Sequence, residues 1–123
     1  MPTKLSTTIS KIHTIPNTAN AAIIEEFHKY MKDNDASDRH QNNELKVVIA
    51  YTKFIGSNNS LCDIKHKEQI ISFLDSKIKP IEQDPDKKWI TTWNHYLHRI
   101  KHLFRWLHPS LHIVRKLHSV FVY

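Results

Sequence analysis

The stretch Asp84–Leu107, DPDKKWITTWNHYLHRIKHLFRWL, decides the fold. Large apolar side chains recur in it every three or four residues, which is the spacing of one face of an α-helix. They are Trp89, Trp93, Tyr96, Leu97, Ile100, Leu103, Phe104 and Leu107. Asp84 is a candidate N-cap, Pro85 suits the first helical position, and Pro109 stops the helix. We therefore predict a long amphipathic helix with one buried face.

The opposite face of this helix is polar and basic. One stripe at spacings of i, i+3, i+7, i+10 and i+14 consists of Thr91, Asn94, His98, Lys101 and Arg105, with Arg99 beside it. The stripe is about 23 Å long at 1.5 Å per residue, so it can lie along a DNA groove. Asn94 and Arg105 are candidates for base contacts, and lysine and histidine for phosphate contacts. A hydrated face on a helix that only packs is the alternative.

The formal net charge of +6 lies entirely in residues 86–123. That segment has seven basic residues, including Lys87 and Lys88, against the single acid Asp86, whereas residues 1–85 balance 11 basic against 11 acidic residues. A neutral body with one basic, aromatic-rich segment is typical of a polyanion binder, and nucleic acid is the first candidate. A basic but merely solvated helix face remains the alternative.

The rest of the chain also predicts helices. Apolar periodicity and polar breaks indicate helices over about 17–33, 38–55 and 66–78. A single glycine, Gly56, argues against hairpins and tight turns. The fold class predicted is therefore all-α.

Local signals mark the ends of these helices. Asn17 and Ser37 are candidate N-caps, and Gly56 occupies the place of a left-handed residue after a helix. The helix over 38–55 has an apolar face and an opposite polar face. The polar face carries Arg39, Asn43, Lys46 and Lys53.

We predict three regions along the chain. Residues 1–16 have no period and are predicted to be a flexible arm, whose Lys4 and Lys11 are candidates for trailing contacts with a partner. Residues 17–109 are predicted to form one helical domain. Residues 110–123 are predicted to be a basic tail or a short final helix.

Several function classes have little support in the sequence. The single Cys62 excludes an internal disulfide and is predicted to be a small buried residue in a reducing compartment. The histidines at 95, 98 and 102 have a spacing that can hold a metal, but no cysteine or carboxylate lies nearby in sequence, so we predict no metal site. No apolar run is long enough for a membrane span. We expect no cofactor, no small-molecule substrate and no membrane association.

The stretch Asp84–Leu107 closely resembles the last helix of the N-terminal core-binding domain of tyrosine recombinases, the phage integrase family, in its archaeal form. The runs 42–56 and 63–77 resemble the same domain, so the resemblance covers about residues 20–108. It implies a SAM-like orthogonal bundle of four to five helices that forms half of a clamp around duplex DNA. The helices that would face the DNA match 38–55 and 85–107 here.

The catalytic groups of that family lie in a separate domain that the resemblance does not cover. His102-Leu103-Phe104-Arg105 and His112-Ile113-Val114-Arg115 both spell the family's His-x-x-Arg pattern, and Tyr123 ends the chain. The first lies inside the core-binding helix, and the second is too close to Tyr123 to fit the family's order. We therefore expect no catalysis by this chain.

The sequence thus predicts a non-catalytic domain that binds double-stranded DNA in the cytoplasm, at the nucleoid, in DNA integration and recombination. The residues predicted to contact DNA are Arg39, Asn43, Lys46, Lys53, Lys87, Lys88, Thr91, Asn94, His98, Arg99, Lys101 and Arg105. The alternative is a protein-interaction module that dimerises or docks on intact recombinase protomers through the apolar residues of 110–123.

Overall fold

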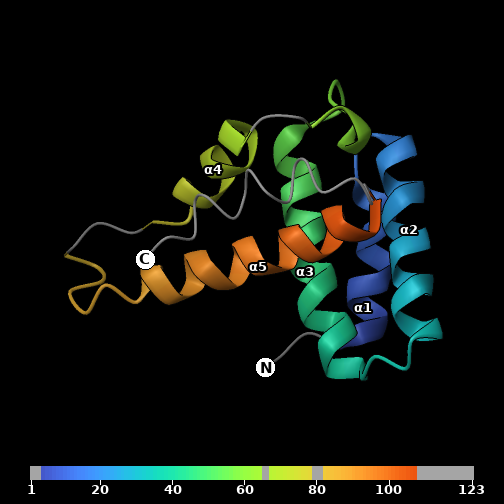
Figure 1. The fold of residues 1–123 in the computed structure, drawn as a ribbon, viewed down its shortest axis with the longest axis horizontal. Coiled ribbons are helices and arrows are strands. Elements are labelled where there is room, and N and C mark those ends of the chain that lie inside the picture. Colours follow the sequence, from blue (N-terminus) through green and yellow to red (C-terminus); the bar gives the residue numbers. More distant parts are fainter. Residues whose placement is uncertain (1–3, 65–66, 79–81, 108–123) are drawn as a thin grey trace. The chain divides into compact units, whose positions relative to one another are not determined.

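The computed structural model describes residues 4–64, 67–78 and 82–107 (Figure 1). All regular structure in these ranges is helical, which confirms the predicted all-α class. The elements are α1 (Leu5–Ser10), the 3₁₀ turn η1 (Lys11–Thr14), α2 (Thr18–Asp33), α3 (Asp38–Ile55), the 3₁₀ turn η2 (Leu61–Asp63), α4 (Lys67–Asp75) and α5 (Trp89–Leu107). No helix in the described ranges is long and apolar enough to cross a membrane.

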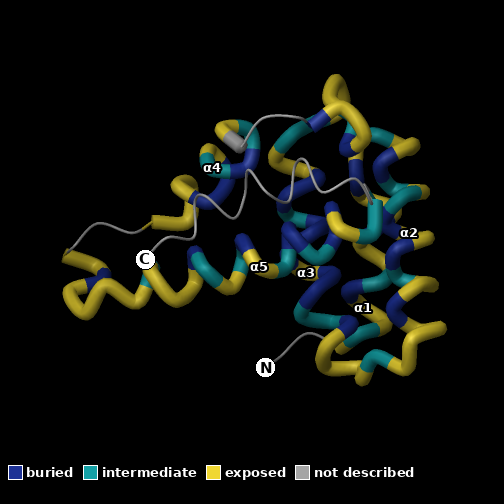
Figure 2. Tube along the Cα trace, in the orientation of Figure 1, coloured by how far each residue is buried: buried dark blue, intermediate teal, exposed yellow. Residues whose placement is uncertain are grey.

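The chain divides into two compact units, residues 1–63 and 64–123. In the first unit α1, α2 and α3 lie side by side, and both α1 and α2 pack on α3 (Figure 1). Buried positions run along α2 and α3, and α1 contributes the buried Thr8 (Figure 2). The core of this unit includes Ile24, Phe27, Leu45, Val48 and Tyr51, which are fully buried.

The N-terminal segment differs from the prediction. Residues 1–16 were expected to be a flexible arm, but the described part from Lys4 onward forms α1 and η1. Thr8, Ile12 and Ile15 are buried, with 1%, 1% and 4% of their surface exposed. A helix of six residues has little stability of its own, so packing against α3 and α2 is what orders this segment.

The predicted ends of α2 and α3 are confirmed. The side chain of Asn17 accepts a hydrogen bond from the amide of Asn20, and that of Ser37 accepts one from the amide of His40. Gly56 follows α3 with φ 80° and ψ −173°, a backbone region open essentially to glycine alone. The loop after it is tied down because the fully buried Asn20 donates to the carbonyl of Asn59 and accepts from the amide of Leu61.

Cys62 does not have the predicted burial. Its side chain is exposed, while its neighbours Leu61 and Ile64 are buried. The apolar residues on either side therefore hold this connection in place, and the thiol faces outward.

In the second unit α4 packs on α5. The rings of Phe73 and Tyr96 stack with centroids 6.1 Å apart, and the indole N–H of Trp93 donates to Asp75 at 3.3 Å. The helix predicted over 66–78 ends at Asp75, which leaves Ile78 41% exposed rather than buried.

The helix predicted to begin at Pro85 begins at Trp89. Lys87 has φ 53°, which is incompatible with a right-handed helix at that position. Asp84 still caps the helix, because its carboxylate accepts hydrogen bonds from the amides of Lys88 and Trp89 at 3.0 and 2.9 Å. The predicted capping residue is therefore confirmed, but four residues separate it from the first residue of the helix.

Candidate nucleic-acid interface

The polar face of α3 carries a row of three cations. Arg39, Lys46 and Lys53 are all exposed and lie seven residues, or two turns, apart. At 1.5 Å per residue the row is about 21 Å long. None of the three makes an ion pair with any residue that the structure describes. Asn43, the fourth residue predicted on this face, is half-buried.

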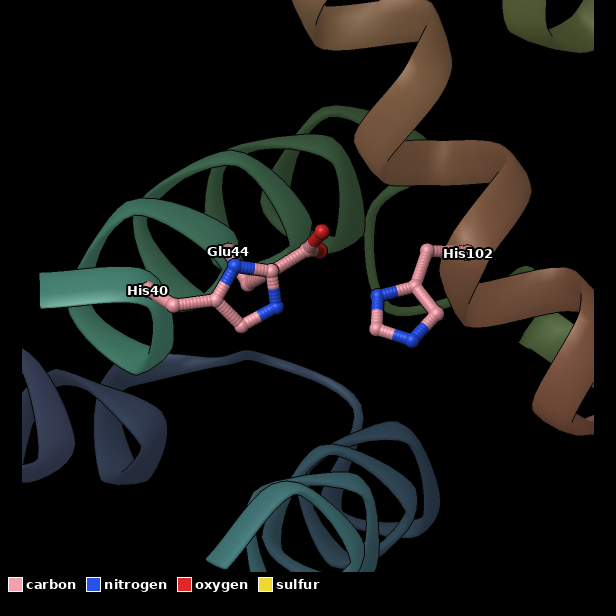
Figure 3. Close-up of side chains that lie close together, drawn as sticks. All are labelled: His40, Glu44 and His102. Carbon is pink, nitrogen blue, oxygen red and sulfur yellow. The ribbon is translucent and has the colours of Figure 1, made fainter. Parts of the chain in front are cut away.

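Acidic side chains do little to offset the charge of this face. α3 contains two acids, Asp38 at its first turn and Glu44. Glu44 is only 1% exposed and so lies on the buried side of the helix. His40 precedes it by one turn on α3 and is exposed (Figure 3). Adjacent cations of the row are about 10 Å apart, close to the Debye length at 0.1 M salt, so their potentials overlap.

The predicted stripe on α5 is interrupted. Thr91, His98 and Arg105 are exposed as expected. Lys101, however, is 4% exposed, and burial together with the nearby Arg105 lowers the pKa of its ammonium. The prediction that Lys101 lies on the exposed face is wrong.

Asn94 is also a poorer candidate than predicted. It is half-buried, and its Oδ1 is buried with no hydrogen-bond partner among the described residues. Reading an adenine edge needs both the oxygen and the nitrogen of an asparagine side chain. The covered oxygen leaves only the amide nitrogen for such a contact.

The exposed face of α5 is rotated from the predicted one. His95 is exposed and His102 is half-buried. The exposed stripe that begins at Thr91 therefore contains these two residues in place of Asn94 and Lys101. The imidazole of His102 projects from the side of α5 (Figure 3).

The remaining predicted residues lie near the start and middle of α5. Lys87 and Lys88 are exposed in the turn before the helix, and Arg99 is half-buried within it. The tail 110–123, with its predicted protomer contacts and Tyr123, lies outside the described residues.

Comparison with protein-family models, with curated proteins and with solved structures finds no match for this chain.

Proposed function

We propose that this chain is a non-catalytic, double-stranded DNA-binding domain of the tyrosine recombinase type, acting in DNA integration and recombination through the basic faces of α3 and α5. The observation that carries the proposal is the row of exposed cations formed by Arg39, Lys46 and Lys53, none of which is paired with an acid in the described part of the chain. A row of cations repels itself unless an anion lies along it. The phosphates of DNA supply such a line of negative charge.

The length of the row favours a polymer over a small anion. A small phosphate compound is bound by groups that converge on one point, whereas these three residues are spread over about 21 Å. Exposed Arg105, Lys87 and Lys88 extend the set of available cations on the second unit. The recombinase part of the proposal rests on the resemblance of Asp84–Leu107, because α3 and α5 are the elements that match the DNA-facing helices of that family.

Catalysis is not part of the proposal. His102 and Arg105 spell the family's catalytic pattern, but they lie in the middle and last turn of α5. Their neighbours Leu103 and Phe104 are fully buried, so the helix serves here as a packing element. Stabilising a phosphoryl transition state requires several convergent donors, which one helix does not provide.

Binding to a random-sequence duplex of about 30 base pairs, followed by fluorescence anisotropy between about 50 and 300 mM salt, tests the proposal. If about five phosphates are neutralised, log K should fall against log salt with a slope of about −4.5. Lys46→Ala/Lys53→Ala should make the slope about 1.8 units shallower. A slope near zero for the wild-type chain would refute the proposal.

The matched control is Lys29→Ala/Lys32→Ala, which removes the same charge from exposed positions of α2. Lys29 lies four residues from Glu25 and from Asp33, so its charge is locally balanced. The control should leave the slope unchanged. An equal effect of both double variants would mean that only net charge matters and that α3 is not the contact surface.

A further inference from the structure

A seam between α1 and α3 runs along the first unit. Two shallow hollows lie on it, of about 590 and 210 Å³. The larger is lined by Lys4, Arg39 and Lys46 among others, and the smaller by Lys11, Lys46 and Lys53 among others. Because Lys46 lines both, the two hollows are neighbours along the seam, and we call the seam with its two hollows the track.

The track has cations on both sides. α3 supplies Arg39, Lys46 and Lys53, and the N-terminal segment supplies Lys4 and Lys11, which are exposed. The two sides run in the same direction, since residues 4 and 5 face the start of α3 and residues 8 and 11 face its middle and end. Asp38 is the single acid among the described residues that line either hollow.

The net charge of this unit is zero and gives no sign of the basic track. Residues 1–63 hold seven basic and seven acidic residues. Four of the acids, Glu25, Glu26, Asp33 and Asp35, belong to α2 or directly follow it. The unit is therefore polarised, with five of its seven cations at the α1–α3 seam and the other two on α2 beside these acids.

The backbone segment that carries Lys4 and Lys11 is held in place by the residues between and beside them. The hydroxyl of Thr8 donates to Oδ1 of Asn42 on α3, and the adjacent Ile12 is 1% exposed. Ordering these lysines in advance reduces the entropy lost when they bind a ligand.

We infer that the α1–α3 seam is a track for one phosphodiester backbone of duplex DNA, with Lys4 and Lys11 contacting phosphates on one side and the α3 row on the other. The inference rests on the proposed function and extends it to a segment that the sequence indicated only as a flexible arm. The half-buried Asn43, which lines the larger hollow, supplies a side-chain amide donor beside the α3 row.

The residues that line the two hollows favour a duplex over a single-stranded nucleic acid. No aromatic ring is among the described residues that line the two hollows, so the seam offers no platform for stacking the bases of a single strand. It also lacks the buried aromatic anchor that usually dominates a protein–protein interface. The ligand that fits best is the backbone of a duplex, because its bases are paired and turned away from the seam.

The test compares Lys4→Ala/Lys11→Ala with the wild-type chain on the same random 30-base-pair duplex used above. Both lysine side chains are exposed, so helicity measured by circular dichroism should not change. We expect the salt slope to become about 1.8 units shallower and the affinity at about 0.1 M salt to fall about tenfold or more. Lys4→Arg/Lys11→Arg, which keeps the charge, should retain the wild-type slope.

Two outcomes would overturn the inference, and they are distinguishable. A steep wild-type slope that Lys4→Ala/Lys11→Ala leaves unchanged refutes the track but preserves the proposed function, which then rests on α3 and α5. A wild-type slope near zero refutes both. Equal losses for Lys4→Ala/Lys11→Ala and the α2 control Lys29→Ala/Lys32→Ala would also refute the track, because the effect would follow net charge alone.

Discussion

The hydroxyl of Thr8 donates a 2.5 Å hydrogen bond to Oδ1 of Asn42, and this bond joins α1 to α3 across 34 residues of sequence. It lies between the two hollows, with Lys4 on one side along the segment and Lys11 on the other. The bond therefore fixes the spacing of the two rows of cations. Loss of the Thr8–Asn42 hydrogen bond should therefore affect both the packing of α1 on α3 and the position of the cations along the seam.

Replacing Thr8 with valine keeps the shape and removes the hydroxyl. We expect the free energy of unfolding to fall by about 1 kcal/mol, the usual net contribution of such a hydrogen bond. DNA affinity should fall as well, because the Lys4 and Lys11 segment is held less firmly. Urea denaturation and fluorescence anisotropy measure the two effects.

Thr7→Val is the matched control, since Thr7 lies on the same helix with its side chain exposed. It should leave both quantities nearly unchanged. Equal destabilisation by the two variants would show that valine in α1, rather than the lost hydrogen bond, is responsible.

Gly56→Ala isolates the cost of a backbone conformation. Gly56 has φ 80° and ψ −173°, and a Cβ built on it meets no atom within 4 Å. Any destabilisation must therefore come from backbone strain rather than from a clash. We expect a loss of about 1 to 3 kcal/mol in the free energy of unfolding, measured by chemical denaturation. No loss would mean that the loop after α3 rearranges freely.

The elements that the sequence predicted well are those with local signals. The range 38–55 matches α3 at both ends, because Ser37 caps it and Gly56 ends it, and both effects act within one turn. Asn17 marks the start of α2 in the same way. Such signals depend on neighbours in sequence and need no knowledge of the fold.

The elements that were missed depend on tertiary contacts. α1 has no apolar period of its own, and what orders it is the bond to Asn42 and the burial of Ile12. Lys4 and Lys11, which flank α1, were therefore visible in the sequence, but the place of their segment on α3 was not. No local pattern in residues 4–14 indicates which distant helix will support them.

The error at Lys101 has a geometric origin. At about 100° per residue, Lys101 lies about 80° around the helix from Thr91, at the edge of the predicted stripe. Charge placed it on the exposed face, but a long side chain at an edge can be covered by whatever packs nearby. Periodicity fixes a helix face only to within one residue, and tertiary packing decides the edges.

Arg105→Ala and Lys101→Met should separate the exposed cation of α5 from the buried one. Arg105 is exposed, so its loss should make the salt slope of DNA binding about 0.9 units shallower. Lys101 is buried, so Lys101→Met should leave the slope unchanged. The anisotropy titration described above measures both, and a larger effect of Lys101→Met would show that the ammonium reaches the DNA.

Lys101→Met should also change the dependence of stability on pH. Burial, together with Arg105, lowers the pKa of Lys101 in the folded chain, whereas lysine in an unfolded chain titrates near 10.4. Between these two values the unfolded chain binds more protons, so the free energy of unfolding rises with pH there. Below both values the buried charge is a constant penalty, and removing it should stabilise the fold at neutral pH.

Thermal unfolding of both proteins at pH 7 and at about pH 10 measures this effect. Lys101→Met should be more stable than the wild type at pH 7, and its advantage should shrink as the pH rises toward about 10.4. Lys88→Met, at an exposed position before the same helix, should keep the wild-type profile. Burial raises the pKa of Tyr51, so above about pH 10 the unfolded chain loses that proton first and stability must fall again. A Lys101→Met profile parallel to the wild type up to about pH 10 would mean that this ammonium is solvated in the folded chain and belongs with the exposed cations after all.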